Sequence, residues 1–472
     1  MKVLLINPRI DSTMAYGRKF ARLGALLPPL GLCYLAGVLR NDRYQVRILD
    51  VNLLGLSYEE TLREIKEDAP ELIGLYATTL GIEAAEELAK KIKGCFPKIA
   101  VVIGGPHISG YGKNTLECAD FDFGIIGEGE RSLLELARHI ENKNKDFRAL
   151  KGLVYRNQDE IVQNETGSPI LDLDTLPHPA RDLLSDFKKY HPKKMLYKKL
   201  PLIHIFTSRG CPFQCTFCQT PFGKKVRFHS AEYVADEITL LVKNFGAKEI
   251  KINDDTFNLI EERVLNIFDI LDRRGIKIFW SCNLRVDTVK NKSFLKAIKE
   301  RGCWLVGLGL ESGNQKILDT LKKGITIEEA KQVCAWAFEA GLKVQASFII
   351  GNPLDTEETI METIDFARSL PLNYPSFALM TPFPGTELWQ TANEFGTFSY
   401  EKFSDLRVSH NPKFIPSGLS AKKMSYLYNK AYRDAYLNPR MIFRQLTNIG
   451  SFSEALRLCS AAFSFLDFRE NG

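Results

Sequence analysis

Short apolar runs alternate with amphipathic helical stretches over most of the chain. In the first third, runs typical of buried strands lie at 3–6, 45–49, 72–76, 100–103 and 123–126. Helical patterns lie between them at 28–39 and 82–96, and another helix is expected after the last run. Strands alternating with helices predict an α/β domain with a doubly wound, Rossmann-like parallel sheet. In such sheets ligands bind outside the carboxyl ends of the strands.

The same alternation resumes after a connector that contains a predicted hairpin at 152–156 and 161–163. Strand patterns lie at 202–207, 249–253, 277–282, 304–310, 343–350 and 376–381, and helical patterns near 230–246, 261–273, 292–301, 326–340 and 357–369. Six such units predict a partial (β/α)6 barrel of the TIM type, with active residues at the carboxyl ends of its strands. Beyond residue 400 we expect helices alone, at 421–437, 439–448 and 451–466. The predicted domains are 1–145, a connector 146–200, 201–400 and a helical C-terminal region 401–472.

Composition narrows the class of protein. A length of 472 residues suits two or three domains, and 45% hydrophobic with 25% charged residues suits a soluble protein. The net charge of +6 is small for this size and argues against a dedicated nucleic-acid binder. The chain opens on a strand pattern and has no run of 18 apolar residues, so we expect neither a signal peptide nor a transmembrane helix. The cysteines then indicate a reducing cytoplasm.

Three cysteines form the most informative motif. Cys211, Cys215 and Cys218 follow the spacing C-x3-C-x2-C. A zinc site would need a fourth ligand, and His204 and His229 are poorly spaced for that role. A disulfide framework is unexpected in a chain of this length without a secretory signal. Three thiolates can hold three irons of a [4Fe–4S] cluster and leave the fourth iron open.

This cysteine run resembles the radical S-adenosylmethionine (SAM) superfamily. The likeness includes Arg209 and Gly210 before the first cysteine and Phe217 before the last. It implies that the open iron binds the amino and carboxylate groups of SAM. One electron then cleaves SAM to methionine and a 5′-deoxyadenosyl radical. The resemblance places Phe217 against the adenine.

Polar residues at other strand ends are candidates for holding SAM. The pair Asp254 and Asp255 suits an ammonium group, although capping of the next helix would also explain it. Arg285, two residues after Asn283, can pair with a carboxylate through its guanidinium fork. The resemblance puts Glu311 near the ribose or methionine part. The SAM-binding residues that we expect are Phe217, Asp254, Asp255, Asn283, Arg285, Glu311 and Ile350, with no catalytic side chain beyond the cluster and this site.

The first domain has no G-x-G-x-x-G after its first strand, so a dinucleotide site is a poor fit. It resembles instead the cobalamin-binding domain that precedes the radical SAM domain in one subfamily. The likeness rests on 28–32, 48–50, 104–107 and 127–130. It implies cobalamin contacts from Asn7, Thr78, Thr79, Gly104, Gly105, Pro106, His107, Gly127, Glu128, Gly129 and Glu130.

One departure concerns the cobalt ligand. Many cobalamin domains carry D-x-H-x-x-G, whose histidine ligates cobalt, and here Asn52 stands at the histidine position after Asp50. An amide is a weaker ligand than imidazole. We therefore hypothesise that this motif gives cobalt no histidine ligand. His107 could ligate cobalt, but packing along the corrin rim or capping the next helix is the preferred interpretation.

The resemblance implies a cobalamin-dependent radical SAM enzyme, in the first place a methyltransferase acting on an unactivated carbon of a small or lipid-like substrate. Oxidative cyclisation or rearrangement without methyl transfer is the alternative within this architecture, and a non-catalytic cobalamin or redox sensor is the alternative of another class. Flavodoxin or ferredoxin would donate the electron. The tail, basic and rich in phenylalanine, is expected to form an amphipathic lid on the barrel mouth, and peripheral membrane contact is a second hypothesis.

Overall fold

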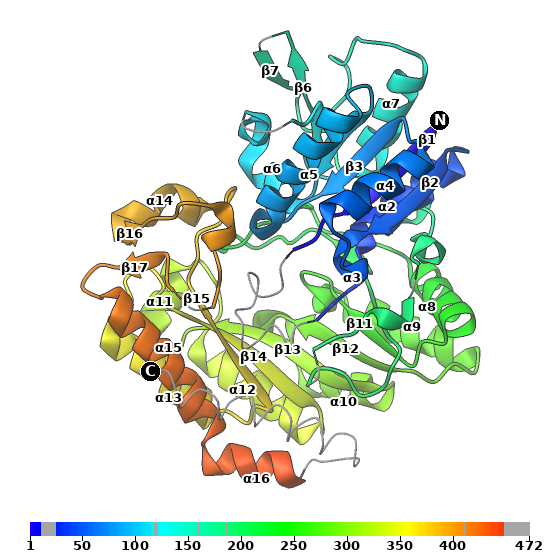
Figure 1. Cartoon of the computed structure of the whole chain (residues 1–472). Coiled ribbons are helices and arrows are strands. Elements are labelled where there is room, and N and C mark those ends of the chain that lie inside the picture. Colours follow the sequence, from blue (N-terminus) through cyan, green and yellow to red (C-terminus); the bar gives the residue numbers. More distant parts are fainter. Residues whose placement is uncertain are drawn as a thin grey trace.

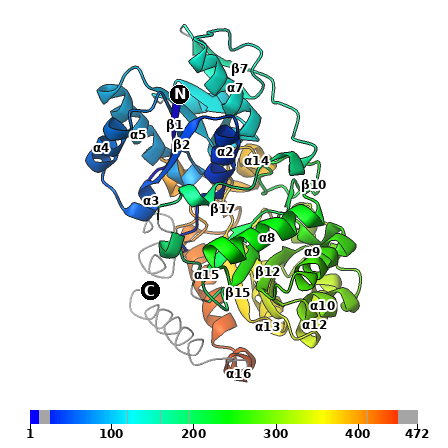
Figure 2. The ribbon, with the colours of Figure 1, turned by 90° about the vertical axis from the view of Figure 1, so that its right-hand side faces the viewer.

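The computed structural model describes residues 1–10, 25–117, 120–158, 160–185, 187–193, 195–409 and 411–447. These residues form two α/β bodies, one above the other in the view of Figure 1, with the last helices along one side of the lower body. Figure 2 shows the same two bodies from the side.

The upper body is built on one seven-stranded sheet. Its strands, in sheet order, are β2 (Gln45–Asp50), β1 (Lys2–Asn7), β3 (Leu72–Tyr76), β4 (Ala100–Gly104), β5 (Phe123–Ile125), β6 (Leu153–Asn157) and β7 (Glu160–Gln163). The first five run parallel, which confirms the doubly wound prediction, and β6 and β7 form an antiparallel hairpin on β5. The predicted hairpin of the connector thus extends this sheet. The strand order reverses at β1 and β3, which is where such sheets bind ligands.

Helices cover both faces of this sheet, so its central strands β1, β3 and β4 are largely apolar. The helices are α2 (Leu30–Asn41), α3 (Val51–Leu54), α4 (Tyr58–Asp68), α5 (Ile82–Cys95), α6 (Pro106–Tyr111) and α7 (Gly129–Glu141). Residues of α2 and α7 share one hydrophobic cluster with the sheet, and residues of α4 and α5 share the other. Helix α4 was not expected from the sequence, although Ser57 and Glu60 form a capping box at its start.

The lower body is a partial barrel of six parallel strands. In sheet order they are β8 (Leu202–Ile205), β11 (Glu249–Ile252), β12 (Phe279–Leu284), β13 (Cys303–Glu311), β14 (Lys343–Ile350) and β15 (Tyr374–Leu379). Its helices are α8 (Ala231–Phe245), α9 (Glu261–Arg273), α10 (Lys292–Glu300), α11 (Gln315–Thr320), α12 (Ile327–Glu339), α13 (Glu357–Ser369) and α14 (Glu387–Phe395). All six predicted strands are present. The short strands β9 (Ser208–Arg209) and β10 (Arg227–Phe228) pair beside the first barrel strand.

The C-terminal helices α15 (Ala421–Tyr436) and α16 (Pro439–Thr447) confirm two of the predicted helical segments. Helix α15 lies along the open edge of the sheet, beside β15. The lid expected of the last, phenylalanine-rich segment falls mostly outside the described residues. The Tyr432 hydroxyl donates to the carbonyl of Phe377 (2.9 Å) and accepts from its N–H (3.2 Å), and Tyr436 donates to the carbonyl of Pro375. These bonds satisfy backbone groups that an edge strand would leave exposed.

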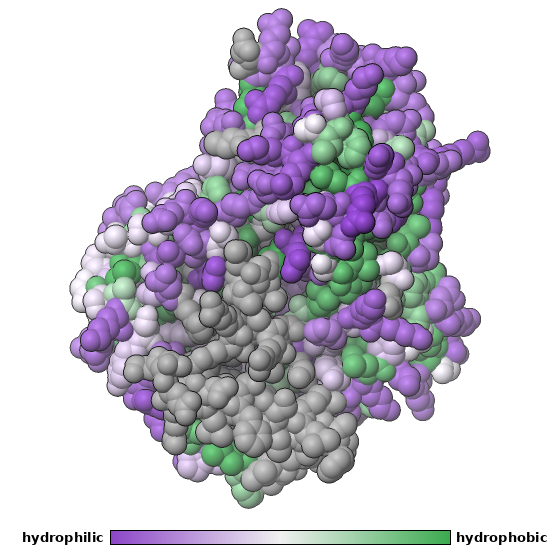
Figure 3. Space-filling view, viewed as in Figure 1, coloured by the Kyte–Doolittle hydropathy of each residue, from purple (hydrophilic) through white to green (hydrophobic). Residues whose placement is uncertain are grey.

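The tail contains a strand that was not expected, and part of it lies outside the described residues. Strand β17 (Phe414–Pro416) pairs with β16 (Gly396–Phe398), so the expectation of helices alone after residue 400 is wrong. The helix expected at 451–466 lies outside the described residues. Phe443 is 70% exposed, but Phe452, Phe463, Phe465 and Phe468 also fall outside the described part, and membrane contact stays a prediction. No helix among the described residues is long and apolar enough to span a bilayer. The coloured part of the face in Figure 3 is mostly hydrophilic, with hydrophobic patches toward its right side.

Candidate functional site

The carboxyl ends of the two sheets meet at the interface between the bodies. Gly110, on α6 after β4, lies against Pro384, which follows β15. A Cβ atom on Gly110 would stand 2.2 Å from the Pro384 carbonyl oxygen. Gln219 donates a hydrogen bond to the same carbonyl at 2.6 Å. Ligands bound at the ends of the two sheets would therefore face each other.

The three motif cysteines lie in the loop that follows β9. Within it the N–H of Cys218 donates to the carbonyl of Cys215 (3.2 Å), and the N–H of Cys211 donates to the carbonyl of Gly223 (3.1 Å). Partial burial and the negative charges of Cys215 and Cys211 together raise the pKa of Cys218 to about 11, so the three sulfurs lie near one another. No three described His, Cys, Asp or Glu side chains surround a single ion.

Buried ion pairs tie this loop to the upper body. Arg209 Nη2 lies 2.6 Å from Glu130 Oε1, and its Nη1 lies 3.3 Å from Glu128 Oε1. Arg227 Nη1 lies 2.8 Å from both oxygens of Glu128. Each of these four side chains is at most 9% exposed. Gly210, with φ of 92°, brings the backbone so close to Lys225 that a Cβ would stand 2.4 Å from its carbonyl oxygen.

This network engages the side chains of Glu128 and Glu130, two of the residues expected to contact cobalamin. Their carboxylates neutralise Arg209 and Arg227, and Glu128 Oε2 also accepts the N–H of Ile170 at 2.8 Å. Removing a buried charge from its partner is costly. The two glutamates therefore position the cysteine loop against the upper body.

The acidic pair after β11 is divided between two roles. Asp254 is 1% exposed and accepts hydrogen bonds from the N–H and hydroxyl of Thr207 and from the hydroxyl of Ser208. Its carboxylate is used inside the protein, so the expected contact with SAM does not hold for it. The side chain of Asp255 reaches the surface. Its carboxyl is still partly surrounded by protein, and this partial burial, together with the negative charge of Asp254, raises its pKa. Of the pair, Asp255 faces the open space.

Arg285 also differs from expectation. Its Nη1 donates to Cys215 Sγ (3.7 Å), its Nη2 donates to the carbonyl of Lys323, and Cζ stands 3.4 Å from the centre of the Phe213 ring. Its Nε pairs with Asp287 at 2.7 Å. The guanidinium fork is thus engaged by protein groups, so it orders the cysteine loop and is not free for the SAM carboxylate.

Glu311 forms an ion pair with Lys323 that was not expected from the sequence. Its Oε1 accepts from Lys323 Nζ at 2.7 Å, with both side chains nearly buried. Glu311 has a φ of 60°, an unusual conformation for a residue other than glycine. The pair lies directly over Gly309, where a Cβ would stand 2.5 Å from Glu311 Oε1. Lys323 lies in the loop after α11, and no local pattern marks it.

We expected Ile350 to lie near the cysteine loop, but its neighbour Ile349 takes that place. Ile350 is fully buried in the barrel core, so its side chain cannot touch a ligand. Ile349 points to the other face of β14 and, with Phe217, packs on the cluster that contains Leu321. Asn283 is exposed on the inner face of β12 and accepts a hydrogen bond from Lys251.

Asn7, expected to contact cobalamin, is used internally. Its Nδ2 donates to Asp50 Oδ1 at 2.8 Å, and Tyr190 donates to Asp50 Oδ2 at 2.6 Å. Asn52 accepts the N–H of Ile10 at 3.1 Å. Both Asp50 and Asn52 therefore serve the exit of an edge strand.

Thr79 and His107 are also enclosed by protein. Thr79 Oγ1 lies 3.4 Å from His107 Nδ1, and each residue is at most 3% exposed. The His107 ring packs edge-on against Phe403 at 4.7 Å. Burial lowers its pKa to about 4. The ring is enclosed by protein and has no access to a ligand, so the structure supports neither cobalt ligation by His107 nor the expected packing along the corrin rim.

The remaining expected cobalamin residues lie half-buried at the carboxyl edge of the upper sheet: Thr78, Gly104, Gly105, Pro106, Gly127 and Gly129. Gly105 requires glycine, because its φ is 110° and a Cβ would stand 2.6 Å from the Ala77 carbonyl oxygen. Gly104 has no atom within 4 Å of the place of its Cβ. The edge is open at Gly104 and closed at Gly105.

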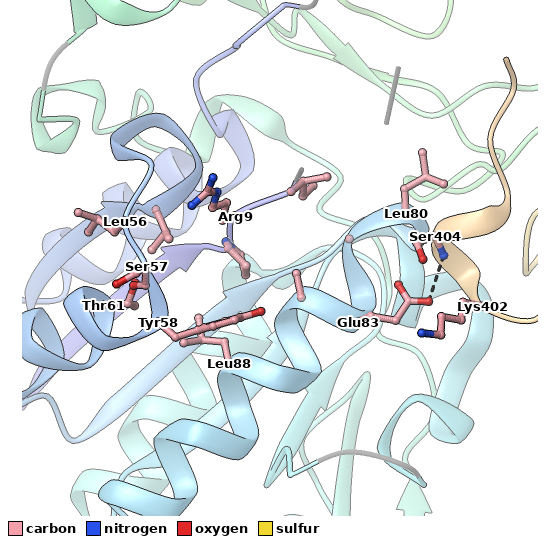
Figure 4. Close-up of a pocket in the computed structure, with 15 residues that line it drawn as sticks. Arg9, Leu56, Ser57, Tyr58, Thr61, Leu80, Glu83, Leu88, Lys402 and Ser404 are labelled. Atoms are coloured by element: carbon pink, nitrogen blue, oxygen red, sulfur yellow. Dashed lines mark hydrogen bonds between the residues drawn. The ribbon is translucent and has the colours of Figure 1, made fainter. Parts of the chain in front are cut away.

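A cavity of about 550 Å³ lies at the point where the strand order reverses (Figure 4). Its walls are formed by residues that follow β1, β2 and β3 and by the segment before β17: Pro8, Arg9, Ile10, Val51, Leu56, Ser57, Tyr58, Thr61, Leu80, Gly81, Glu83, Ala84, Leu88, Lys402 and Ser404. The Ser404 N–H donates to Glu83 Oε1 at 3.0 Å and joins the two sides. Arg9 and Lys402 are the cations of this cavity, and neither was expected from the sequence.

Comparison with known proteins identifies both bodies. Residues 205–367 match the family model of the radical SAM superfamily, and residues 20–137 match that of the B12 binding domain. An uncharacterized methyltransferase of Pyrococcus horikoshii is 34% identical over 453 residues, which cover 94% of this chain and 95% of that protein. The anaerobic magnesium-protoporphyrin IX monomethyl ester cyclase of Rubrivivax gelatinosus is 28% identical, covering 98% of this chain and 82% of the relative.

A solved structure agrees over the whole length. The radical SAM methyltransferase TsrM of Kitasatospora setae, with cobalamin and a [4Fe–4S] cluster bound, superposes with a TM-score of 0.71. It is 18% identical and covers 100% of this chain and 99% of TsrM, which establishes the shared fold. The chain belongs to the radical SAM superfamily, among members that carry a B12 binding domain, and its cofactors are a [4Fe–4S] cluster, SAM and cobalamin.

Proposed function

We propose that the protein is a cobalamin-dependent methyltransferase that acts on an unactivated carbon of a small molecule. The observation that carries this proposal is the buried pairing of Arg209, two residues before the first motif cysteine, with Glu130 of the upper body. A methyl donor on one body and a hydrogen-abstracting site on the other must reach the same carbon. A rigid junction between the two sites supports that requirement.

When bound, the cofactors supply one-electron cleavage of SAM and a carrier for the methyl group. The residues of the chain would position these cofactors relative to one another. Cys211, Cys215 and Cys218 would hold the cluster, and Asp255 would bind the SAM ammonium. Burial raises the pKa of the Asp255 carboxyl. An ammonium beside it would stabilise the charged carboxylate and so oppose that rise.

Other residues support that site. Phe217 and Ile349 offer an apolar surface beside the cysteine loop, which suits an adenine ring. Arg285 and the Glu311–Lys323 pair would act as positioning residues, because their charged groups contact the loop or one another.

We place cobalamin at the carboxyl edge of the upper sheet. The cavity in Figure 4 lies at the switch between β1 and β3, and Arg9 and Lys402 suit the phosphodiester of the nucleotide tail. Its volume of about 550 Å³ accommodates part of such a molecule. The corrin would then lie toward Thr78 and Gly104, facing the barrel.

Cyclisation without methyl transfer is a second candidate. The observation that favours it is the likeness of the Rubrivivax cyclase over 98% of this chain. The two reactions differ in their SAM products, because only methyl transfer forms S-adenosylhomocysteine.

The test measures these products in the anaerobic holoenzyme, with reduced flavodoxin or ferredoxin as the expected electron donor. With candidate substrates, methyl transfer predicts S-adenosylhomocysteine and 5′-deoxyadenosine in roughly equal amounts, as one use of SAM for each task requires. 5′-Deoxyadenosine with a converted substrate and no S-adenosylhomocysteine would overturn methyl transfer and favour cyclisation. The Cys218→Ala variant, which lacks a cluster ligand, should form neither.

A further inference from the structure

The inner face of the barrel is polar. Lys251, Asn283 and Ser347 share this face, because Lys251 pairs with Ser281, Asn283 with Gly307, and Gly309 with Ser347 across neighbouring strands. Asn283 and Ser347 are exposed although both lie inside strands of the sheet. The residues that alternate with them pack under the outer helices. The face therefore lines an open chamber.

Lys251 has no counter-charge in this chamber. Its Nζ donates to Asn283 Oδ1 at 3.1 Å, and no carboxylate among the described residues lies within ion-pair distance. Glu249 lies two positions before Lys251, and its carboxylate is already engaged in hydrogen bonds to other groups. Glu249 accepts from Trp304 Nε1 at 2.7 Å and from the N–H groups of Lys198 and Lys199. Burial lowers the pKa of Lys251, as expected for an ammonium without an anion.

The chamber has a closed floor beneath Lys251. A cluster of Trp304, Leu305 and Tyr374 packs with Met195 and Leu196 of the connector. The groups that act electrostatically on Lys251 are Cys282, Cys303 and Glu249. The lysine that acts on Cys218 is instead Lys323. Lys251 lies inside β11, before the carboxyl end of the strand, and thus deeper than the cysteine loop, where a substrate would enter beneath SAM.

We propose that Lys251 and Asn283 form a subsite for a carboxylate or phosphate group of the substrate. Because Asn283 Oδ1 faces Lys251, its Nδ2 is left to donate into the chamber. An acid could accept one hydrogen bond from each side chain. This inference rests on the proposed function and adds the substrate class, an acidic small molecule.

The test is equilibrium dialysis of the anaerobic holoenzyme, loaded with cobalamin and SAM, against three probes: benzoate, phenyl phosphate and the neutral benzamide. We expect at least one acid to bind about ten-fold more tightly than benzamide, as a charge-assisted hydrogen bond allows. Lys251→Met should abolish that preference and Lys251→Arg should retain it. Lys331→Met, which removes an exposed lysine of α12, is the matched control and should behave as the wild type.

Three results would overturn the subsite. One is equal binding of acids and benzamide by the wild type. The second is an acid preference that persists in Lys251→Met. The third is a loss of SAM affinity in Lys251→Met, which would assign Lys251 to the SAM carboxylate. Because no readout depends on methyl transfer, failure of the proposed function would leave these results interpretable.

Discussion

Arg209 Nη2 and Glu130 Oε1 are 2.6 Å apart, and neither side chain is more than 6% exposed. The arginine belongs to the cysteine loop of the barrel, and the glutamate begins α7 of the B12 binding domain. The guanidinium also lies between the rings of Tyr34 and Phe222, at 4.9 and 5.1 Å. The position of the cysteine loop relative to the B12 binding domain thus depends on a nearly buried pair.

Glu130→Gln should destabilise the protein by about 1 to 3 kcal/mol, because the buried Arg209 loses its nearest carboxylate and keeps only Glu128 at 3.3 Å. Urea denaturation of the anaerobic protein measures this. The matched control is Glu165→Gln, which removes an 85% exposed partner of Lys151 and should cost less than about 1 kcal/mol. Equal effects of the two changes would contradict a structural role for the buried pair.

A methyl group at Gly110 should push the two bodies apart. Gly110→Ala places a Cβ 2.2 Å from a backbone carbonyl of Pro384, which cannot give way as a side chain can. We expect SAM cleavage to continue while S-adenosylhomocysteine formation falls at least about ten-fold, as misplacement of about 1 Å can cause. Gly94→Ala, in α5 with no atom within 4 Å, should leave both rates unchanged. An unaltered product ratio in Gly110→Ala would count against fixed spacing between the sites.

The cysteines should separate into ligands and bystanders. Cys218→Ala should lose the iron–sulfur absorbance, because a cubane retains too few thiolates. Cys95→Ala, at an exposed position on α5, should keep it. Iron and sulfide analysis after anaerobic reconstitution decides the matter, and a full cluster in Cys218→Ala would refute the assignment.

His107 should make the protein sensitive to acid. Burial holds its pKa at about 4, against about 6.5 for an ordinary histidine. Between these values the unfolded chain binds a proton that the folded chain does not, so stability falls as pH drops from 6.5 to 4, by at most about 1.4 kcal/mol per pH unit. Denaturation midpoints at pH 7 and pH 5 should therefore differ more in the wild type than in His107→Phe. An equal pH dependence would show that His107 is accessible to protons.

Local patterns predicted the strands and the cysteine loop, since apolar periodicity and motif spacing are both written within a few residues. They did not predict which carboxylates serve the ligand. Glu128 and Glu130 stand in a typical cobalamin turn, yet their partners come from about 80 to 100 residues away. Ile349 and Ile350 differ only in the face of β14 that they occupy, which a one-residue uncertainty in a strand inverts. Lys251 and Lys323 carry no motif and emerge only from the folded contacts.

The most direct test of the account is the cobalamin and iron content of the anaerobically purified, reconstituted chain. We predict about one cobalamin, as one switch-point site in the upper sheet requires, and about four irons per chain, as one cubane requires. Absorbance after cyanide extraction and iron analysis give these values. A protein that cleaves SAM with a full cluster but binds no cobalamin would contradict the central claim.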